Sequence, residues 1–273
     1  MNTAWISLIL FLFLLASYHK RMLSASGFVG ALALALCFVF FKEWLFLSMM
    51  IFFFLSSSLL TQWEKTKKRA ITEGQTEKGG RRDLFQVAAN GGVPWVIGCV
   101  SFFHPSSYGL FAFLGSLATV MADTWGTELG LLSGGPVRVF WTGKIVKAGT
   151  SGGVTAAGYG GGFLGSALLG VFAWVMLQVF QPPVLAGLTF SRIFLVSVSS
   201  GVLGMSFDSL LGATCQTVLR CDTCAEETEM RIHVCGRTTR RLKGLAVLSN
   251  DGVNALSSLV GSLMGLGFGV LFR

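Results

Sequence analysis

The sequence is divided into apolar runs that are each long enough to cross a lipid bilayer. These runs are residues 3–18, 25–41, 44–61, 86–103, 108–131, 153–180, 189–214 and 244–271. A transmembrane helix needs about 20 mainly apolar residues, because its rise per residue must cover the hydrocarbon core. The sequence therefore predicts an all-α, polytopic membrane helix bundle with about eight spans, formed by residues 1–273 as a single domain.

Composition argues against a soluble domain. Hydrophobic residues make up 52% of the chain and charged residues 12%, whereas soluble domains have about 25% charged residues. The first apolar run lacks a basic N-terminal region and a small-residue cleavage pattern. We therefore expect it to be a true span and not a removed signal peptide.

Lysine and arginine are concentrated in alternate loops. The basic loops are 20–21, 62–85, 133–152 and 215–243, whereas the intervening segments hold only Lys42, Arg192 and Arg273. Lys and Arg are retained on the cytoplasmic side of membrane proteins. We therefore expect an integral protein of the cell membrane with both termini outside and the basic loops in the cytoplasm. The net charge of +8 follows from this topology and attracts anionic lipid or phosphate, so no nucleic-acid partner is expected.

Acidic residues interrupt the apolar runs, where an ionised carboxylate costs at least ~2.5–3.5 kcal/mol. They are Asp123, Glu128, Asp208 and Asp251. In the predicted topology all of them fall in the cytoplasmic half of the bundle. At the helical rise, Asp123 lies about 12 Å before the end of its span and Asp251 about 10 Å after the start of its own. We expect one water-accessible pocket to hold them; structural hydrogen bonding between helices is the alternative.

Oxygen-bearing side chains accompany these acids. Asp123 and Thr127 are four residues apart and share a helical face, as do Asn250 and Asn254. Carboxylate and hydroxyl oxygens suit a hard cation such as magnesium, which normally shares its ligands with substrate phosphates. An Asp that caps a broken helix is the alternative for Asp123. The predicted magnesium ligands are Asp123, Asp208 and Asp251.

A glycine-rich segment of the loop 133–152 predicts a phosphate site. Lys144 and Lys147 precede the run 149–153, and a Gly-rich helix start follows. Glycines at a helix N-terminus let backbone N–H groups converge on an anion, and a nearby lysine adds positive charge. The spacing is not that of a Walker loop. Close helix packing is the competing interpretation, and we favour it for 158–170.

Other polar groups belong to the same prediction. Asn90 opens the fourth span and could help to bind an anion there, although a simple helix start explains it equally well. The basic loop 62–85 is interpreted as a solvated loop, with a mobile lid as the alternative. The predicted nucleotide- and phosphate-binding residues are Asn90, Lys144, Lys147, Gly149, Thr150, Ser151, Gly152, Gly153, Asn250 and Asn254.

The insert 215–243 carries a pattern of metal ligands. Cys221 and Cys224 form a Cys-x-x-Cys pair, and His233 and Cys235 follow as His-x-Cys. Two such pairs match a tetrahedral zinc site, and a cytoplasmic position argues against disulfides. We predict a structural zinc ion, since four protein ligands leave no open position for chemistry. Redox-active or free thiols are the alternative.

Together these patterns resemble an integral membrane family that includes transmembrane protein 19 and plant phytyl-phosphate kinase. The resemblance covers about residues 86–262 and rests on 90–92, 122–130, 149–155, 207–214 and 250–254. The bacterial branch of that family is similar also in its Cys/His insert. The resemblance implies a kinase that phosphorylates an isoprenoid monophosphate, and a fainter similarity to phytol and dolichol kinases implies a nucleoside triphosphate donor, typically CTP.

We therefore expect a membrane kinase that transfers a phosphoryl group from CTP or ATP to a phytyl- or polyprenyl-phosphate-like isoprenoid monophosphate. Phosphoryl transfer requires mainly positioning and charge neutralisation, and the predicted catalytic residues are Asp123, Glu128, Asp208 and Asp251. Two alternatives remain open. A cation- or proton-coupled transporter would not depend on a nucleotide, and a CTP-dependent lipid-phosphate cytidylyltransferase would release pyrophosphate.

Overall fold

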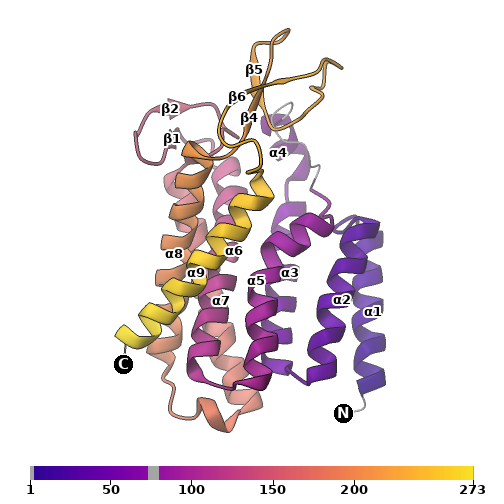
Figure 1. Cartoon of the computed structure of the whole chain (residues 1–273), viewed down its shortest axis with the longest axis vertical. Helices are drawn as coiled ribbons and strands as arrows, with labels where there is room; N and C mark the ends of the chain where they lie inside the picture. Colours follow the sequence, from indigo (N-terminus) through magenta and orange to yellow (C-terminus); the bar gives the residue numbers. More distant parts are fainter. Residues whose placement is uncertain (1–2, 73–79, 273) are drawn as a thin grey trace.

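The computed structural model describes residues 3–72 and 80–272, and Figure 1 shows a bundle of long helices with small sheets at one end. The helices are α1 (Thr3–His19), α2 (Ala25–Phe41), α3 (Trp44–Gln62), α4 (Lys65–Thr72), α5 (Leu84–Phe103), α6 (Ser107–Leu132), α7 (Ala156–Phe180), α8 (Phe190–Thr214) and α9 (Asn250–Leu271), with a short 3₁₀ turn η1 (Pro183–Leu185). The long helices run alternately up and down, so α1 begins and α9 ends at the same end of the bundle (Figure 1). The predicted helical bundle is confirmed.

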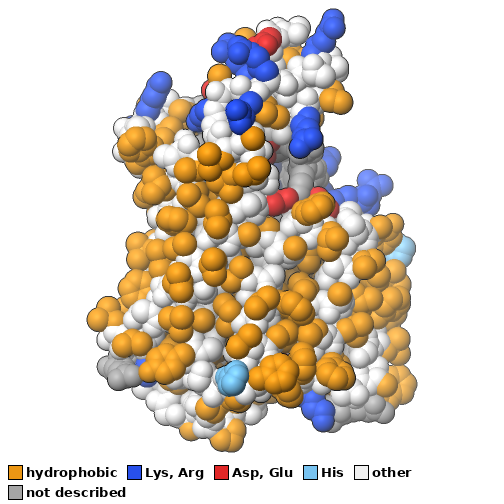
Figure 2. Space-filling model, viewed as in Figure 1, with side chains coloured by type: hydrophobic (Ala, Val, Ile, Leu, Met, Phe, Trp, Pro, Cys, Tyr) orange, Lys and Arg blue, Asp and Glu red, His pale blue; other side chains and the backbone are white. Residues whose placement is uncertain are grey.

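Within residues 3–72 and 80–272, five helices are long and apolar enough to cross a membrane, namely α3, α5, α7, α8 and α9. Helices α1 and α2 are apolar but have 17 residues each. Helix α6 has 26 residues, and its Asp123 and Glu128 lower its mean hydropathy. Hydrophobic side chains cover much of the face of the bundle that Figure 2 shows, as expected for contact with lipid tails. The number of spans stays a prediction.

The helices begin where a short polar side chain precedes an apolar run. The side-chain oxygens of Ser24, Ser106, Thr155, Thr189 and Ser249 each accept a backbone N–H bond from the first turn of the following helix. At α5, Asp83 and Gln86 form a reciprocal capping box. These bonds satisfy N–H groups that a helix cannot pair internally.

Helix α6 lies at the centre of the bundle and packs against α3, α5, α7, α8 and α9. Its residues from Leu110 to Ala122 are all buried. Glycines allow this close approach: Gly115 packs against the backbone of Gly261 and Gly265 on α9, and Gly126 against that of Gly158 on α7. Such small-residue contacts are typical of membrane helices. The packing role favoured for 158–170 agrees with this contact.

Two small antiparallel sheets, which the sequence did not predict, lie at one end of the bundle (Figure 1). The first has the order β2-β1-β3 and the second the order β5-β4-β6. The strands are β1 (Val137–Val139), β2 (Ile145–Val146), β3 (Gly153–Val154), β4 (Val218–Cys221), β5 (Glu226–Thr228) and β6 (Arg240–Lys243). We call this end of the molecule the sheet end, and residues 215–243 the insert.

Two predicted spans begin later than the sequence indicated. Residues 153–154 belong to β3, and α7 begins only after the Thr155 cap. Before α9, Gly244 takes a left-handed conformation and Leu245 N–H bonds to Cys215 O, so this backbone pairs with the insert and not within a helix. The prediction that Asp251 lies about 10 Å inside its helix is therefore wrong, because Asp251 lies in the first turn of α9.

The contact between α6 and α9 gives a stability test. A side chain at Gly265 would meet Phe111 O and the backbone of Gly115, whereas one at Gly267 would meet nothing within 4 Å. We predict that Gly265→Leu destabilises the bundle by at least about 1–3 kcal/mol through overpacking, and that Gly267→Leu leaves stability nearly unchanged. Thermal unfolding of both variants in detergent checks this. Equal melting temperatures would contradict the proposed packing.

Candidate functional site

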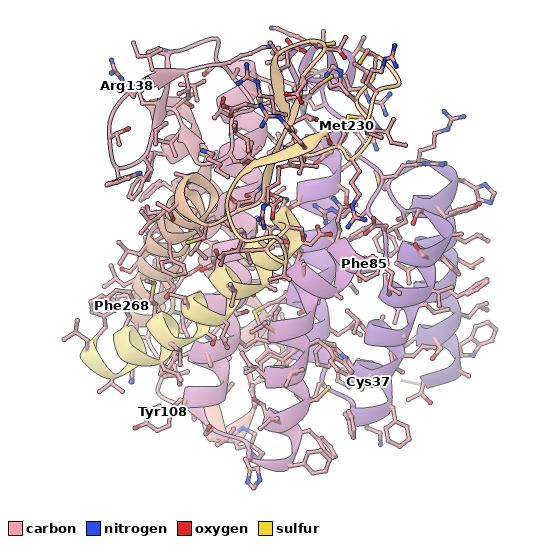
Figure 3. All side chains as sticks on the ribbon, turned by 45° about the horizontal axis from the view of Figure 1, so that its top comes forward. Cys37, Phe85, Tyr108, Arg138, Met230 and Phe268 are labelled. Carbon is pink, nitrogen blue, oxygen red and sulfur yellow. The ribbon has the colours of Figure 1, made fainter. Side chains whose placement is uncertain are left out.

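The sheet end encloses a cavity of about 1750 Å³. Residues from all the helices from α3 to α9 line it, together with the loop before α7 and part of the insert. Figure 2 shows acidic side chains in the hollow between the insert and the bundle, with Lys and Arg side chains around it. In Figure 3, Met230 of the insert lies at this end, whereas Cys37, Tyr108 and Phe268 lie toward the other. The cavity thus lies between the polar sheet end and the apolar helices of the bundle.

Two carboxylates from neighbouring helices meet in this cavity. Asp123 of α6 and Asp208 of α8 are close enough for their charges to interact, and Ser257 of α9 lies beside Asp208. Within the part of the chain that the structure describes, neither carboxylate forms a salt bridge. Adjacent acids without a cationic partner repel one another when ionised, so this pair suits a hard cation with oxygen ligands.

Helix α9 adds further oxygen ligands to the cavity. Asn250, Asp251 and Asn254 all line it from the first turns of this helix. Thr127 lines the cavity together with Asp123, in agreement with the prediction that the two residues share one face of their helix. The structure therefore brings all four predicted acids to one cavity, although they come from three different helices.

Glu128 differs from the other acids because both of its oxygens have partners. Lys68 Nζ of α4 lies 2.5 Å from Glu128 Oε2, and Thr61 Oγ1 of α3 donates to Oε1 at 2.6 Å. Lys68 also donates to Leu60 O at 2.7 Å, and only 5% of this lysine is exposed. The interpretation of loop 62–85 as merely solvated is therefore wrong for α4, which a buried ion pair ties to α6.

Basic side chains surround the acids. Those that line the cavity are Lys65, Lys68, Arg69, Arg82, Arg231 and Arg241. Burial lowers the pKa of Arg82 to about 10, with nearby Glu128 opposing the shift, so its guanidinium stays cationic at neutral pH. Burial also lowers the pKa of Lys65, and the positive charges of neighbouring arginines lower it further. A bound anion would relieve this repulsion.

The glycine-rich loop reaches the cavity, but the two lysines before it do not. Gly149, Thr150, Ser151, Gly152 and Gly153 all line the cavity. Gly149 and Gly152 have positive φ angles of 88° and 73°, which glycine adopts without strain. A side chain at Gly152 would also clash with the backbone of α8 at Ala213. Glycine is therefore required where this loop packs between α8 and the cavity.

Lys144 and Lys147 lie on the exposed surface and are absent from the cavity wall. The β1–β2 hairpin holds Lys144 away from the loop, since Lys144 lies between these strands. Lys147 directly follows β2 and meets the loop through its backbone, because its carbonyl accepts bonds from the N–H and hydroxyl of Thr150. Lys147 Nζ instead lies 3.1 Å from Glu226 Oε1 of β5. The cations of the cavity wall come from α4, Arg82 and the insert. No pattern in the sequence distinguishes them from other basic residues of the predicted cytoplasmic loops.

The remaining predicted polar residue, Asn90, lines the cavity from α5. Its Nδ2 donates to Gln86 O at 3.0 Å, one turn earlier in the same helix. Gln86 lines the cavity too. The sequence analysis also did not identify Tyr159 of α7, whose hydroxyl lies 3.0 Å from Ser206 Oγ on α8.

The Cys and His residues of the insert come together in a second site. One ligand atom each from Cys221, Cys224, His233 and Cys235 lies within 4.8 Å of every other. His233 Nδ1 and Cys235 Sγ lie 3.3 Å apart, and Cys221 Sγ and Cys235 Sγ lie 3.6 Å apart. Three thiol sulfurs and one imidazole nitrogen fit a tetrahedral metal site such as that of zinc.

Comparison with known proteins agrees with the membrane fold. Residues 8–262 match the family described as integral membrane protein DUF92. The chain is 29% identical over 269 residues to Protein PGR of Arabidopsis thaliana, covering 91% of this chain and 89% of the relative. It is 26% identical over 247 residues to an uncharacterized membrane protein of Methanocaldococcus jannaschii, covering 90% and 86%. No solved structure matches.

The chain therefore belongs to the DUF92 family of integral membrane proteins. The family resemblance that its residue patterns indicated is confirmed.

The ion pair between α4 and α6 gives a second test. Lys68→Met leaves Glu128 without its cationic partner in a largely buried site, which costs about 3–5 kcal/mol. The adjacent Lys67 is exposed, so Lys67→Met should change stability by less than about 0.5 kcal/mol. In the double variant Lys68→Met/Glu128→Gln, part of the loss should return. Thermal unfolding in detergent measures each effect, and equal losses for both lysine variants would contradict the assignment.

Proposed function

We propose that this protein is a membrane phosphotransferase that transfers a phosphoryl group from CTP or ATP to an isoprenoid monophosphate. The observation that supports it is the meeting of acids, cations and a glycine-rich loop in one cavity. In the reaction, a phosphate oxygen of the acceptor attacks the γ-phosphorus of the donor. The bond to the β-phosphate breaks, and the products are an isoprenoid diphosphate and a nucleoside diphosphate.

Asp123 and Asp208 are the proposed metal ligands, with Asp251 as a third. The Asp123 and Asp208 carboxylates are adjacent and lack cationic partners among the described residues, which fits a site for magnesium. Held by these carboxylates, magnesium would supply positive charge that neutralises the donor phosphates. Because the acceptor phosphate is already anionic, the reaction needs no general base, and we assign none.

The proposed phosphate ligands lie around these acids. The loop 149–153 and the residues Asn90, Asn250 and Asn254 line the same cavity. Within the loop, the N–H groups of Thr150 and Gly153 already donate to Lys147 O and Thr150 O, so the proposed phosphate donors are the N–H groups of Gly149, Ser151 and Gly152. Arg82, Arg231 and Arg241 add positive charge, which stabilises the negative charge of the transferring group. In this proposal the arginines of the cavity wall have the phosphate-binding role that the sequence analysis predicted for Lys144 and Lys147.

Glu128 acts in this proposal as a positioning residue and not as a metal ligand. Its oxygens are held by Lys68 and Thr61, which fixes α4 against α6 and α3. Helix α4 in turn supplies Lys65 and Arg69 to the cavity wall. The ion pair between Lys68 and Glu128 therefore fixes the positions of Lys65 and Arg69 in the cavity wall.

The sheet end would face the cytoplasm. The basic loops gather there, as membrane proteins retain Lys and Arg on that side. A nucleoside triphosphate would then reach the cavity from the cytoplasm, whereas the lipid acceptor would reach it from the bilayer.

The insert would hold a structural zinc ion. Its four ligands leave no open position, so the metal would fix backbone and not take part in chemistry. Glu226 links the site to the cavity, because one of its oxygens lies 3.6 Å from His233 Nε2 and the other bonds Lys147 beside the glycine-rich loop. Zinc would therefore hold the part of the insert that covers the cavity.

The phosphotransfer proposal can be tested with purified protein in detergent, magnesium, labelled CTP or ATP, and prenyl monophosphates. We predict a prenyl diphosphate product, and a loss of at least about 100-fold in kcat for Asp123→Asn and for Asp208→Asn, as for loss of a group that stabilises transition-state charge. Glu227→Gln serves as the control, since Glu227 is exposed on β5.

Two results would overturn this assignment. Full activity in both aspartate variants would remove their proposed role. Release of pyrophosphate, in place of a nucleoside diphosphate, would identify a cytidylyltransferase.

The zinc proposal predicts about one zinc ion per chain in the purified protein. Cys221→Ser and Cys224→Ser should each lose the metal, because a tetrahedral site lacking one thiolate binds zinc much more weakly. Cys215→Ser should retain it, since Cys215 lies outside the ligand cluster. Metal analysis by mass spectrometry measures the content, and unchanged zinc in Cys221→Ser would contradict the site.

A further inference from the structure

A second, apolar cavity lies among α1, α2, α3 and α5, and we call it the slot. Its free volume is about 80 Å³, and its apolar lining suits a hydrocarbon segment and disfavours a charged head group. Apolar side chains line most of it, among them Phe13, Leu34, Ala35 and Met50. Helix α6 and the acids that it carries do not line the slot.

The slot and the large cavity share part of their walls. Arg82, Gln86 and Asn90 line both. These three polar residues occupy the start of α5 and the residue just before its cap. The slot therefore begins where the cavity has a buried cation and two amides, and continues into the bundle as an apolar space.

A glycine keeps the slot open on the α5 side. A side chain at Gly91 would approach Met50 Cε to 3.2 Å and Leu34 Cδ1 to 3.4 Å, both of which line the slot. The neighbouring Gly92 has nothing within 4 Å of such a side chain. The long, unbranched side chain of Met50 can change rotamer to admit a guest.

We propose that the slot binds the first part of the hydrocarbon tail of the lipid phosphate acceptor, with the phosphate at Arg82, Gln86 and Asn90. This inference rests on the proposed phosphotransfer for the identity of the acceptor. A polar junction that leads into an apolar space matches a molecule with an anionic head and an apolar chain. Burial of the chain is favourable because it removes apolar surface from water. The slot thus selects acceptors by their tails.

The test compares two adjacent glycines. Gly91→Leu should fill the slot, and Gly92→Leu is the matched control on the same helix. Ala35→Phe fills the slot from α2, and Ala33→Phe, at an exposed position of that helix, is its control. Each variant is assayed with geranylgeranyl monophosphate and, as the short acceptor, with methyl monophosphate, which has no tail to enter the slot. We expect both slot variants to lose at least tenfold in kcat/KM with the long acceptor and less than twofold with the short one.

Equal effects on the two acceptors, or no effect of either slot variant, would overturn the inference. A photoreactive geranylgeranyl monophosphate analogue separates this failure from failure of the proposed reaction. Labelling of α2, α3 or α5 that both slot variants weaken supports the slot even if no phosphoryl transfer occurs. Labelling elsewhere, or labelling that the slot variants leave unchanged, contradicts the slot even if transfer occurs.

Discussion

Close backbone contact around α6 is the interaction on which the cavity depends. Glycines of α6 lie directly against glycines of α7 and α9, and Gly204 of α8 packs against Thr119 of α6. In the glycine–glycine contacts no side chain separates the helices, which leaves them little freedom to shift. Asp123 and Asp208 therefore meet because α6 and α8 are in close contact one turn before each acid, at Thr119 and Gly204. An ionised acid in hydrocarbon is unfavourable, so a structure that holds two side by side indicates a function that needs them.

The sequence predicted the elements that follow from local physical chemistry. Apolar runs of helical length gave the long helices, and Ser, Thr or Asp at their starts gave the caps. The polar residues within the runs also met as expected, because alternation of helix direction brings the ends of α6 and α8 beside the start of α9. Asp123, Asp208, Asp251 and the loop 149–153 were found in this way.

Other features depend on contacts that a single sequence does not reveal. Lys68 resembles any cytoplasmic lysine, and its partner Glu128 lies 60 residues further along the chain. The two sheets consist of strands of two to four residues, too short to show alternation. Lys144 was expected to point at the cavity because it is near the loop in sequence, but the β1–β2 hairpin turns it outward.

The insert connects the predicted metal site with the cavity. Arg231 and Arg241 of the insert line the cavity, and Glu226 of β5 contacts both His233 and Lys147. A change in the metal site would therefore alter the cavity wall without touching the acids. In the proposed enzyme, the insert would supply cations to one side of the cavity, and the bundle would supply the carboxylates and the slot for the lipid tail.

The central claim is that Asp123 and Asp208 hold one divalent ion together with the donor phosphates. Electron paramagnetic resonance of Mn²⁺ added to zinc-loaded protein in detergent tests it most directly. The account predicts a bound Mn²⁺ whose spectrum changes when CTP or ATP is added and whose binding is lost in Asp123→Asn and in Asp208→Asn. Mn²⁺ binding that is unchanged in both variants would contradict it.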